Sequence, residues 1–136
     1  MYDMNVYVFG NPDVACDAAP FTILQKLIQD FPQLNFVVIQ PNEDLPFIGE
    51  ENPLLLDTIY GISQPAVFSE GYLDAIRLST SSSAHDFDLG FQLKYLKKIG
   101  KITHFSLIGI PAEKEINYDL IHSILRKLVA HDMHGS

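Results

Sequence analysis

The stretch VYVFGNPDVACDAAPFTILQKLIQDF, residues 6–31, contains the change of periodicity that decides the fold. Asn5–Phe9 is an apolar, β-rich run, and a Gly-Asn-Pro turn follows it. Phe21–Phe31 then carries apolar residues at helical spacing, and Pro32 stops that pattern. The stretch therefore predicts a strand followed by a helix.

The rest of the chain continues this alternation of short apolar runs and amphipathic segments. We expect strands at Asn35–Ile39 and Leu54–Ile59, an extended segment at Ala66–Leu78, a helix at Phe87–Ile99 that Gly100 ends, a strand at Thr103–Ile110 and a helix at Tyr118–Val129. Strands that alternate with helices imply right-handed βαβ units. The sequence thus predicts an α/β protein with a mainly parallel sheet covered by helices on both faces.

Length and charge limit the classes of function. The chain has 136 residues, of which 47% are hydrophobic, and this predicts a single globular domain spanning residues 1–136. Its formal net charge is −8, with only nine Lys and Arg. Because binding to phosphate backbones needs clustered basic residues, we expect no nucleic-acid partner.

Cysteine content and hydropathy indicate the compartment. Cys16 is the only cysteine, so a disulfide within the chain is impossible. No stretch approaches the roughly 20 consecutive apolar residues that span a bilayer, and an acid, Asp3, stands where a signal peptide carries Lys or Arg. We therefore expect a cytoplasmic protein without a membrane partner.

Three side chains are candidates for a site at one rim of the predicted sheet. Asp17 follows the first strand, Asp57 stands near the end of the third, and His85 precedes the helix at Phe87–Ile99. In parallel sheets sites form beyond the carboxyl ends of the strands, so the three side chains could reach one rim. Carboxylate and imidazole groups are suitable ligands for a divalent metal ion with open positions for water or substrate.

Each candidate also has a structural explanation. Asp17 could favour the start of the helix electrostatically, and Asp57 could hydrogen-bond to a neighbouring loop. His85 stands in a serine-rich stretch and could belong to an ordinary capping cluster. Cys16 suggests a Cys-His hydrolase, but the sequence shows no cationic neighbour that would lower the pKa of its thiol.

Four blocks of the chain resemble one enzyme family. GNPDVACDAAP, LLLDTI, SAHDFDLGFQLKYL and FSLIGIP, in this order, are similar to blocks of the hydrogenase maturation endopeptidases. The resemblance runs from Val6 to about Ile124. That family removes a C-terminal peptide from the large subunit of nickel-iron hydrogenases after nickel insertion. The resemblance implies a phosphorylase/hydrolase-like fold, a three-layer sandwich whose twisted, mainly parallel sheet is flanked by helices.

The resemblance also implies roles for the candidate residues. By position, Asp17, Asp57 and His85 correspond to the family residues that contact the metal, and they are therefore the expected catalytic and metal-binding residues. The implied partner is the large-subunit precursor, which presents the nickel. Zinc or cadmium would substitute in vitro. The sequence shows no interface, and a monomer is favoured.

The chain departs from the family pattern at three places. Val8 stands where the family usually has a glycine, and Cys16 replaces one acid of a pair. Gln40–Glu43 replaces an Asp-Gly-Gly-Thr-like segment associated with substrate choice. These departures leave a second function open, that of a diverged, non-proteolytic accessory protein that binds metal or a partner on the same scaffold.

Overall fold

Five strands and two longer helices make up most of the described part of the chain. The computed structural model describes residues 4–9, 19–39, 52–59, 62–69, 96–111 and 116–135. In chain order the elements are β1 (Met4–Val8), α1 (Ala19–Asp30), β2 (Leu34–Val38), β3 (Leu54–Ile59), β4 (Ala66–Ser69), β5 (Ser106–Pro111) and α3 (Tyr118–Gly135). Residues 96–98 are also helical.

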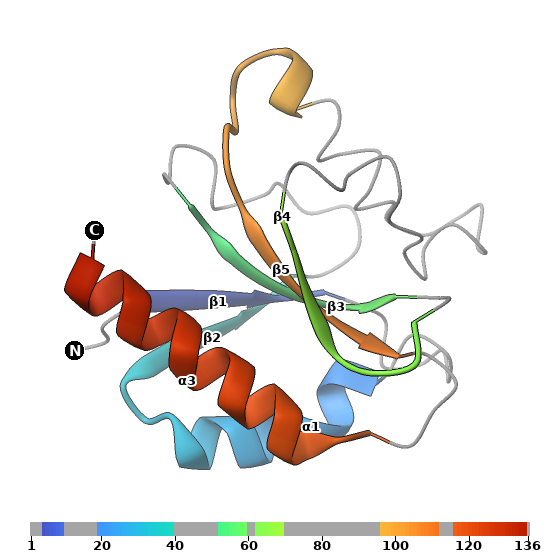
Figure 1. The fold of residues 1–136 in the computed structure, drawn as a ribbon. Coiled ribbons are helices and arrows are strands. Elements are labelled where there is room, and N and C mark those ends of the chain that lie inside the picture. The colour runs from blue at the N-terminus through green and yellow to red at the C-terminus, as the bar shows by residue number, and fades with distance from the viewer. Residues whose placement is uncertain are drawn as a thin grey trace.

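The strands form one sheet in the order β2-β1-β3-β5-β4 (Figure 1). β1 pairs in parallel with β2 and with β3, and β3 pairs in parallel with β5. β4 runs antiparallel along β5 and is the exception among these strands. The described residues therefore form an α/β fold with a mostly parallel sheet, as the sequence predicts.

The predicted strands occur, with differences at their ends. β3 has the predicted bounds Leu54–Ile59, and β1 and β2 each lie one residue earlier than predicted. β5 begins at Ser106 instead of Thr103, because Ser106 lies opposite Leu54, where β3 begins. Only the first part of the predicted extended segment is described, and it forms β4.

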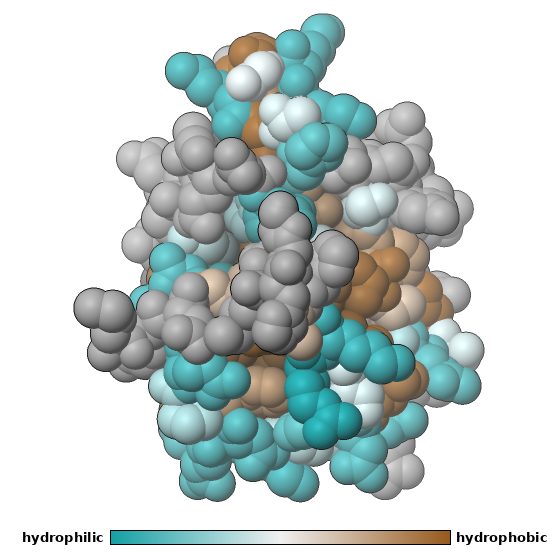
Figure 2. Space-filling view, turned by 60° about the vertical axis from the view of Figure 1, so that its left-hand side comes forward, coloured by the Kyte–Doolittle hydropathy of each residue, from teal (hydrophilic) through white to brown (hydrophobic). Residues whose placement is uncertain are grey.

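Both long helices match predicted helices. α1 starts before Phe21 and ends at Asp30, and α3 begins at Tyr118 as predicted but continues beyond Val129 to Gly135. Neither of the two is long and apolar enough to cross a lipid bilayer. The helices lie in the lower part of Figure 1, and in Figure 2, which is turned about the vertical axis, mostly hydrophilic residues cover the same lower part of the molecule.

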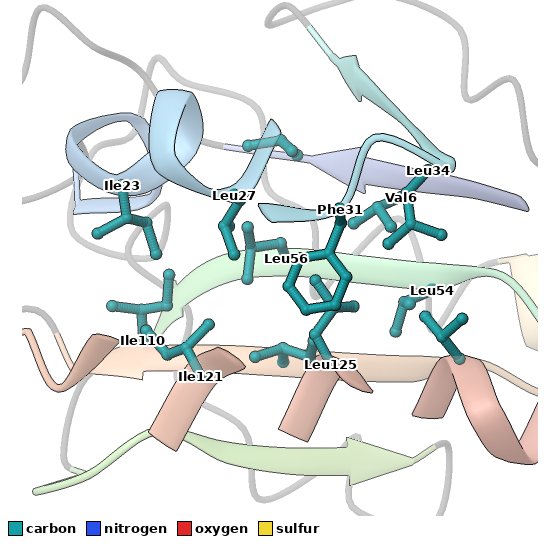
Figure 3. Close-up of a cluster of buried hydrophobic side chains, with 13 residues drawn as sticks. Val6, Ile23, Leu27, Phe31, Leu34, Leu54, Leu56, Ile110, Ile121 and Leu125 are labelled. Carbon is teal, nitrogen blue, oxygen red and sulfur yellow. The ribbon is translucent and has the colours of Figure 1, made fainter. Parts of the chain in front are cut away.

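α1 and α3 pack on one face of the sheet, and we call the cluster between them and the strands the helix-side core (Figure 3). Each fully buried aliphatic side chain stabilises the fold by about 1.5–3 kcal/mol. Ile28 has helical spacing with the apolar residues of α1 but is exposed. The buried members are Val6, Val8, Ile23, Leu27, Phe31, Leu34, Leu54, Leu56, Ile108, Ile110, Ile121, Leu125 and Val129.

A second cluster, the far-side core, lies on the opposite face of the sheet. Its strand residues alternate with those of the helix-side core, because successive side chains of a strand point to opposite faces. Three further members, Leu96, Ile102 and Phe105, come from the chain just before β5. The complete set of buried members is Tyr7, Phe9, Ile39, Leu55, Ile59, Leu96, Ile102, Phe105 and Leu107.

A polar contact joins the end of α1 to the start of α3. The Tyr118 hydroxyl donates a hydrogen bond to Asp30 Oδ2 at 2.6 Å, and Lys26 Nζ lies 4.3 Å from the centre of the Tyr118 ring. The imidazole of His122 lies 4.8 Å from the ring of Phe31, centre to centre. Partial burial and the hydrogen bond to Asp30 raise the pKa of Tyr118 above its ordinary value.

Replacing Tyr118 by Phe is expected to lower the free energy of unfolding by about 1 kcal/mol at neutral pH, because an exposed hydrogen bond to a carboxylate is lost. The raised pKa means that the folded state favours the neutral phenol, so its stabilisation is complete below the unfolded pKa of about 10. That stabilisation is lost as the pH rises further. Urea unfolding at neutral and alkaline pH measures both effects.

The partner variant supplies the control. Asp30→Ala removes the acceptor of this hydrogen bond, so the double variant Tyr118→Phe/Asp30→Ala should lose less than the sum of the two single losses. Fully additive losses would show that the hydrogen bond contributes nothing to the joint between α1 and α3.

Candidate functional site

Asp57 is the one predicted site residue that the structure describes. It lies in β3, whose six residues LLLDTI are all buried. The Asp57 side chain is 0% exposed, and Asp57 and Thr58 are the buried polar residues of the described ranges. β3 is the central strand of the five-stranded sheet, between β1 and β5.

Strand alternation fixes the face on which Asp57 lies. Leu55 and Ile59, two residues before and after it, belong to the far-side core. Leu56 belongs to the helix-side core. Side chains two residues apart in a strand share a face, so the Asp57 carboxylate lies on the face away from α1 and α3.

The carboxylate accepts a hydrogen bond from its own strand. The Thr58 amide donates to Asp57 Oδ1 at 2.7 Å. Near it, the Phe9 amide donates to the Leu56 carbonyl of β3 at 2.8 Å. In a continuing parallel ladder the Thr58 amide would be the next donor toward β1. The Asp57 side chain therefore accepts a backbone amide one residue after Leu56, the last β3 residue in the register with β1.

This point is also where the strand order reverses. After β1 the chain first adds β2 on one side of β1 and then β3 on the other. In open parallel sheets ligands bind beyond the carboxyl ends of the strands at such a reversal. Asp57 lies in the second half of β3, one residue after Leu56, which pairs with Val8 of β1. The fold therefore places this carboxylate where a ligand site is expected.

Gly109 shapes the side of Asp57 that faces β5. The two residues are partners in the register of β3 and β5. A Cβ atom at Gly109 would collide with Ile59 Cδ1, and it would lie 2.9 Å from Ile59 Cγ1 and 3.2 Å from Phe68 Cε2. Ile59 and Phe68 therefore occupy the space that a larger side chain would fill, and they form an apolar wall beside Asp57.

The other predicted site residues lie outside the described residues. These are Asp17, His85 and Cys16, together with the segment Gln40–Glu43. In the sequence Asp17 lies between the end of β1 and Ala19, where α1 begins. The predicted proximity of Asp17 and His85 to Asp57 stays a prediction.

The surroundings of Asp57 suit a role that needs charge. Burying a carboxylate among apolar side chains costs several kcal/mol unless hydrogen bonds or a cation compensate. The Thr58 amide supplies part of that compensation, and a bound cation would add to it. Within the described ranges no three His, Cys, Asp or Glu side chains come together. A metal site containing Asp57 therefore needs ligands from outside those ranges, where Asp17 and His85 lie in the sequence.

Two contributors to this site are absent from the predicted set. The Thr58 amide and Gly109 both depend on the register between strands, which the periodicity of one segment does not contain. A glycine within an apolar strand often marks a close approach of neighbouring groups, and in this respect Gly109 was recognisable from sequence.

The chain was compared with known protein families, curated proteins and solved structures. No family model matches the chain, and searches of curated proteins and of solved structures find no match.

Proposed function

We propose that this protein is an endopeptidase that removes the C-terminal peptide of a nickel-iron hydrogenase large subunit after nickel has been inserted. The observation that carries the proposal is the buried Asp57 in the second half of β3, next to the reversal of strand order. The resemblance of the sequence blocks assigns the metal contact to this same residue. The remaining support comes from the sequence alone.

The proposed fold is the three-layer sandwich that the resemblance implies. α1 and α3 form one helical layer. On the opposite face, Leu96 is helical and buried in the far-side core. Since Leu96 belongs to the predicted helix Phe87–Ile99, this contact supports a second helical layer on the Asp57 face of the sheet.

In the proposed reaction Asp17, Asp57 and His85 bind the nickel that the precursor presents. Nickel bound to the substrate could polarise a carbonyl or a water molecule as a Lewis acid. The buried Asp57 carboxylate would hold a fixed negative charge at the rim of the sheet, so a precursor without the metal would lack the matching positive charge. Metal recognition would thereby make cleavage depend on a loaded precursor.

The direct test is cleavage of a purified large-subunit precursor. We expect the nickel-loaded precursor to be shortened and the nickel-free form to remain intact. Shortening of both forms would contradict metal recognition. Binding of the loaded precursor without any cleavage would favour the diverged accessory protein instead.

A metal titration tests the site without the precursor. Isothermal titration with nickel, zinc or cadmium should show binding to the wild-type protein that is lost in His85→Ala and in Asp57→Asn. Asp119→Asn, an exposed site on α3, is the matched control and should bind as the wild type does. If the wild type and the three variants bind the metal equally well, His85 and Asp57 are not part of the metal site.

A further inference from the structure

A basic turn lies between the far-side core and β5. We use this name for Lys97, Lys98, Ile99, Gly100 and Lys101, which connect the helical residues 96–98 to the segment before β5. In Figure 1 this part of the chain extends beyond the sheet on the side where β5 begins. At the top of Figure 2 hydrophilic and hydrophobic residues lie together in the same protruding region.

Backbone hydrogen bonds give the turn a defined shape. The Lys101 amide donates to the Leu96 carbonyl at 2.9 Å, and the Gly100 amide donates to the Lys97 carbonyl at 3.2 Å. Gly100 has a φ of 78°, so the turn is a Schellman helix end, in which glycine adopts the left-handed conformation. Among the described residues, no atom lies within 4 Å of the position that a Cβ atom at Gly100 would occupy.

Buried residues on both sides anchor the turn. Leu96 precedes it and Ile102 follows it, and these side chains are 6% and 4% exposed in the far-side core. The Ile102 amide also donates to the Leu96 carbonyl, at 3.3 Å. Because both ends are fixed, the residues between them are presented outward in one arrangement.

The turn concentrates positive charge in an acidic chain. Lys97, Lys98 and Lys101 are exposed and account for three of the nine Lys and Arg, whereas the chain has 17 Asp and Glu. No acid occurs from Leu89 to Ala112. Lys97 and Lys98 complement the helix dipole, but Lys101 lies beyond the helix. No ion pair to these lysines is found in the described part of the chain.

An exposed apolar residue lies among these lysines. Ile99 is 47% exposed, more than the other large hydrophobic residues exposed in the described ranges, Ile28 and Val67. An apolar centre with a charged rim is the usual composition of a protein–protein contact. The basic turn therefore has both the charge and the apolar contact that an acidic protein surface would match.

We propose that the basic turn binds an acidic surface on the protein substrate, as a second contact apart from the Asp57 site; this inference rests on the proposed function. An anionic membrane fits less well. Three lysines would contribute about 1 kcal/mol each at an anionic surface, a single isoleucine adds little anchoring, and the chain's net charge of −8 is repelled.

The position of the turn predicts its effect on the reaction. It precedes Ser106, the first residue of β5, whereas Asp57 pairs with Gly109 farther along that strand. The turn is therefore on the amino-terminal side of the sheet and the candidate site is toward the carboxyl ends. Contact there would strengthen binding of the precursor, and cleavage of the bound precursor would proceed at the same rate.

The test compares two double variants with equal change in charge. Lys98→Glu/Lys101→Glu alters the turn, and Arg126→Glu/Lys127→Glu alters exposed residues of α3. At low salt the turn variant should raise the KM and the Kd for nickel-loaded precursor about tenfold or more, leave kcat unchanged and weaken the salt dependence of binding. The α3 variant should behave like the wild type. Ile99→Ser, which keeps all charges, should raise the Kd by a smaller factor.

The outcomes separate this inference from the proposed function. If the wild type cleaves the loaded precursor and both double variants have equal KM and Kd, the turn is not a substrate contact. If the wild type neither binds nor cleaves the precursor, the proposed function itself is wrong. Binding to phosphatidylserine vesicles that the turn variant alone loses would assign the turn to a membrane and overturn the inference. Thermal unfolding of the turn variant should match that of the wild type, which shows that weakened binding is not a folding defect. The milder Lys98→Gln/Lys101→Gln variant, which removes the two charges without reversing them, should weaken precursor binding in the same direction.

Discussion

Asp57→Asn should abolish cleavage of the nickel-loaded precursor while the protein remains folded. Asparagine has nearly the same shape as aspartate but carries no negative charge. If the carboxylate faces the metal of the substrate, we expect the rate to fall by at least about 100-fold, as when a group that stabilises charge in a transition state is removed. Single-turnover cleavage followed by mass spectrometry measures this loss.

Stability should change much less than activity in this variant. The Thr58 amide can donate to an asparagine side-chain oxygen as it does to Asp57 Oδ1. Replacing a buried charge by a neutral group also removes a desolvation cost. We therefore expect the free energy of unfolding to stay within about 1 kcal/mol of the wild type. A stable Asp57→Asn protein with full activity would show that this carboxylate takes no part in cleavage.

Gly109→Ala should cause the largest loss of stability among these variants. The added Cβ would collide with Ile59 Cδ1 and press on Phe68 Cε2, in the wall beside Asp57. Ile59 is buried in the far-side core, and the partly buried Phe68 packs against that core. Overpacking of this kind costs about 1–3 kcal/mol, which urea or thermal unfolding measures.

A second substitution identifies the cause of that loss. Ile59→Val removes the Cδ1 atom that collides, so Gly109→Ala/Ile59→Val should lose less stability than the sum of the two single losses. Gly100→Ala is the matched control, because its cost arises from a φ of 78° and not from crowding. Ile59→Val should leave the cost of Gly100→Ala unchanged. Additive losses in the Gly109 pair would contradict the collision.

Local pattern predicted the elements well but not all of their ends. The apolar run Leu54–Ile59 has no polar interruption except Asp57 and Thr58, and its strand has the predicted bounds. The predicted strand Thr103–Ile110 was too long at its start, because the register of β3 and β5 begins with Leu54 opposite Ser106. Pairing partners, which are distant in sequence, decide these ends.

The candidate site was predictable to a similar degree. An acid in an apolar strand marked Asp57 as unusual, because burying a carboxylate is costly. The sequence did not show that the Thr58 amide would compensate part of that cost, or that Gly109 would lie beside it. Both relations require the order and register of the sheet. That order depends on contacts between distant segments, which no single window of sequence contains.

The central position of β3 also restricts how this protein can change during evolution. Asp57 belongs to the strand on which both cores are built, so a mutation that moves its carboxylate also disturbs packing on both faces. The connections beyond the strands can change in length or composition at a much lower cost. Under the proposed function, recognition of a different client protein would therefore change through loops and surface residues, while Asp57 keeps its place on β3.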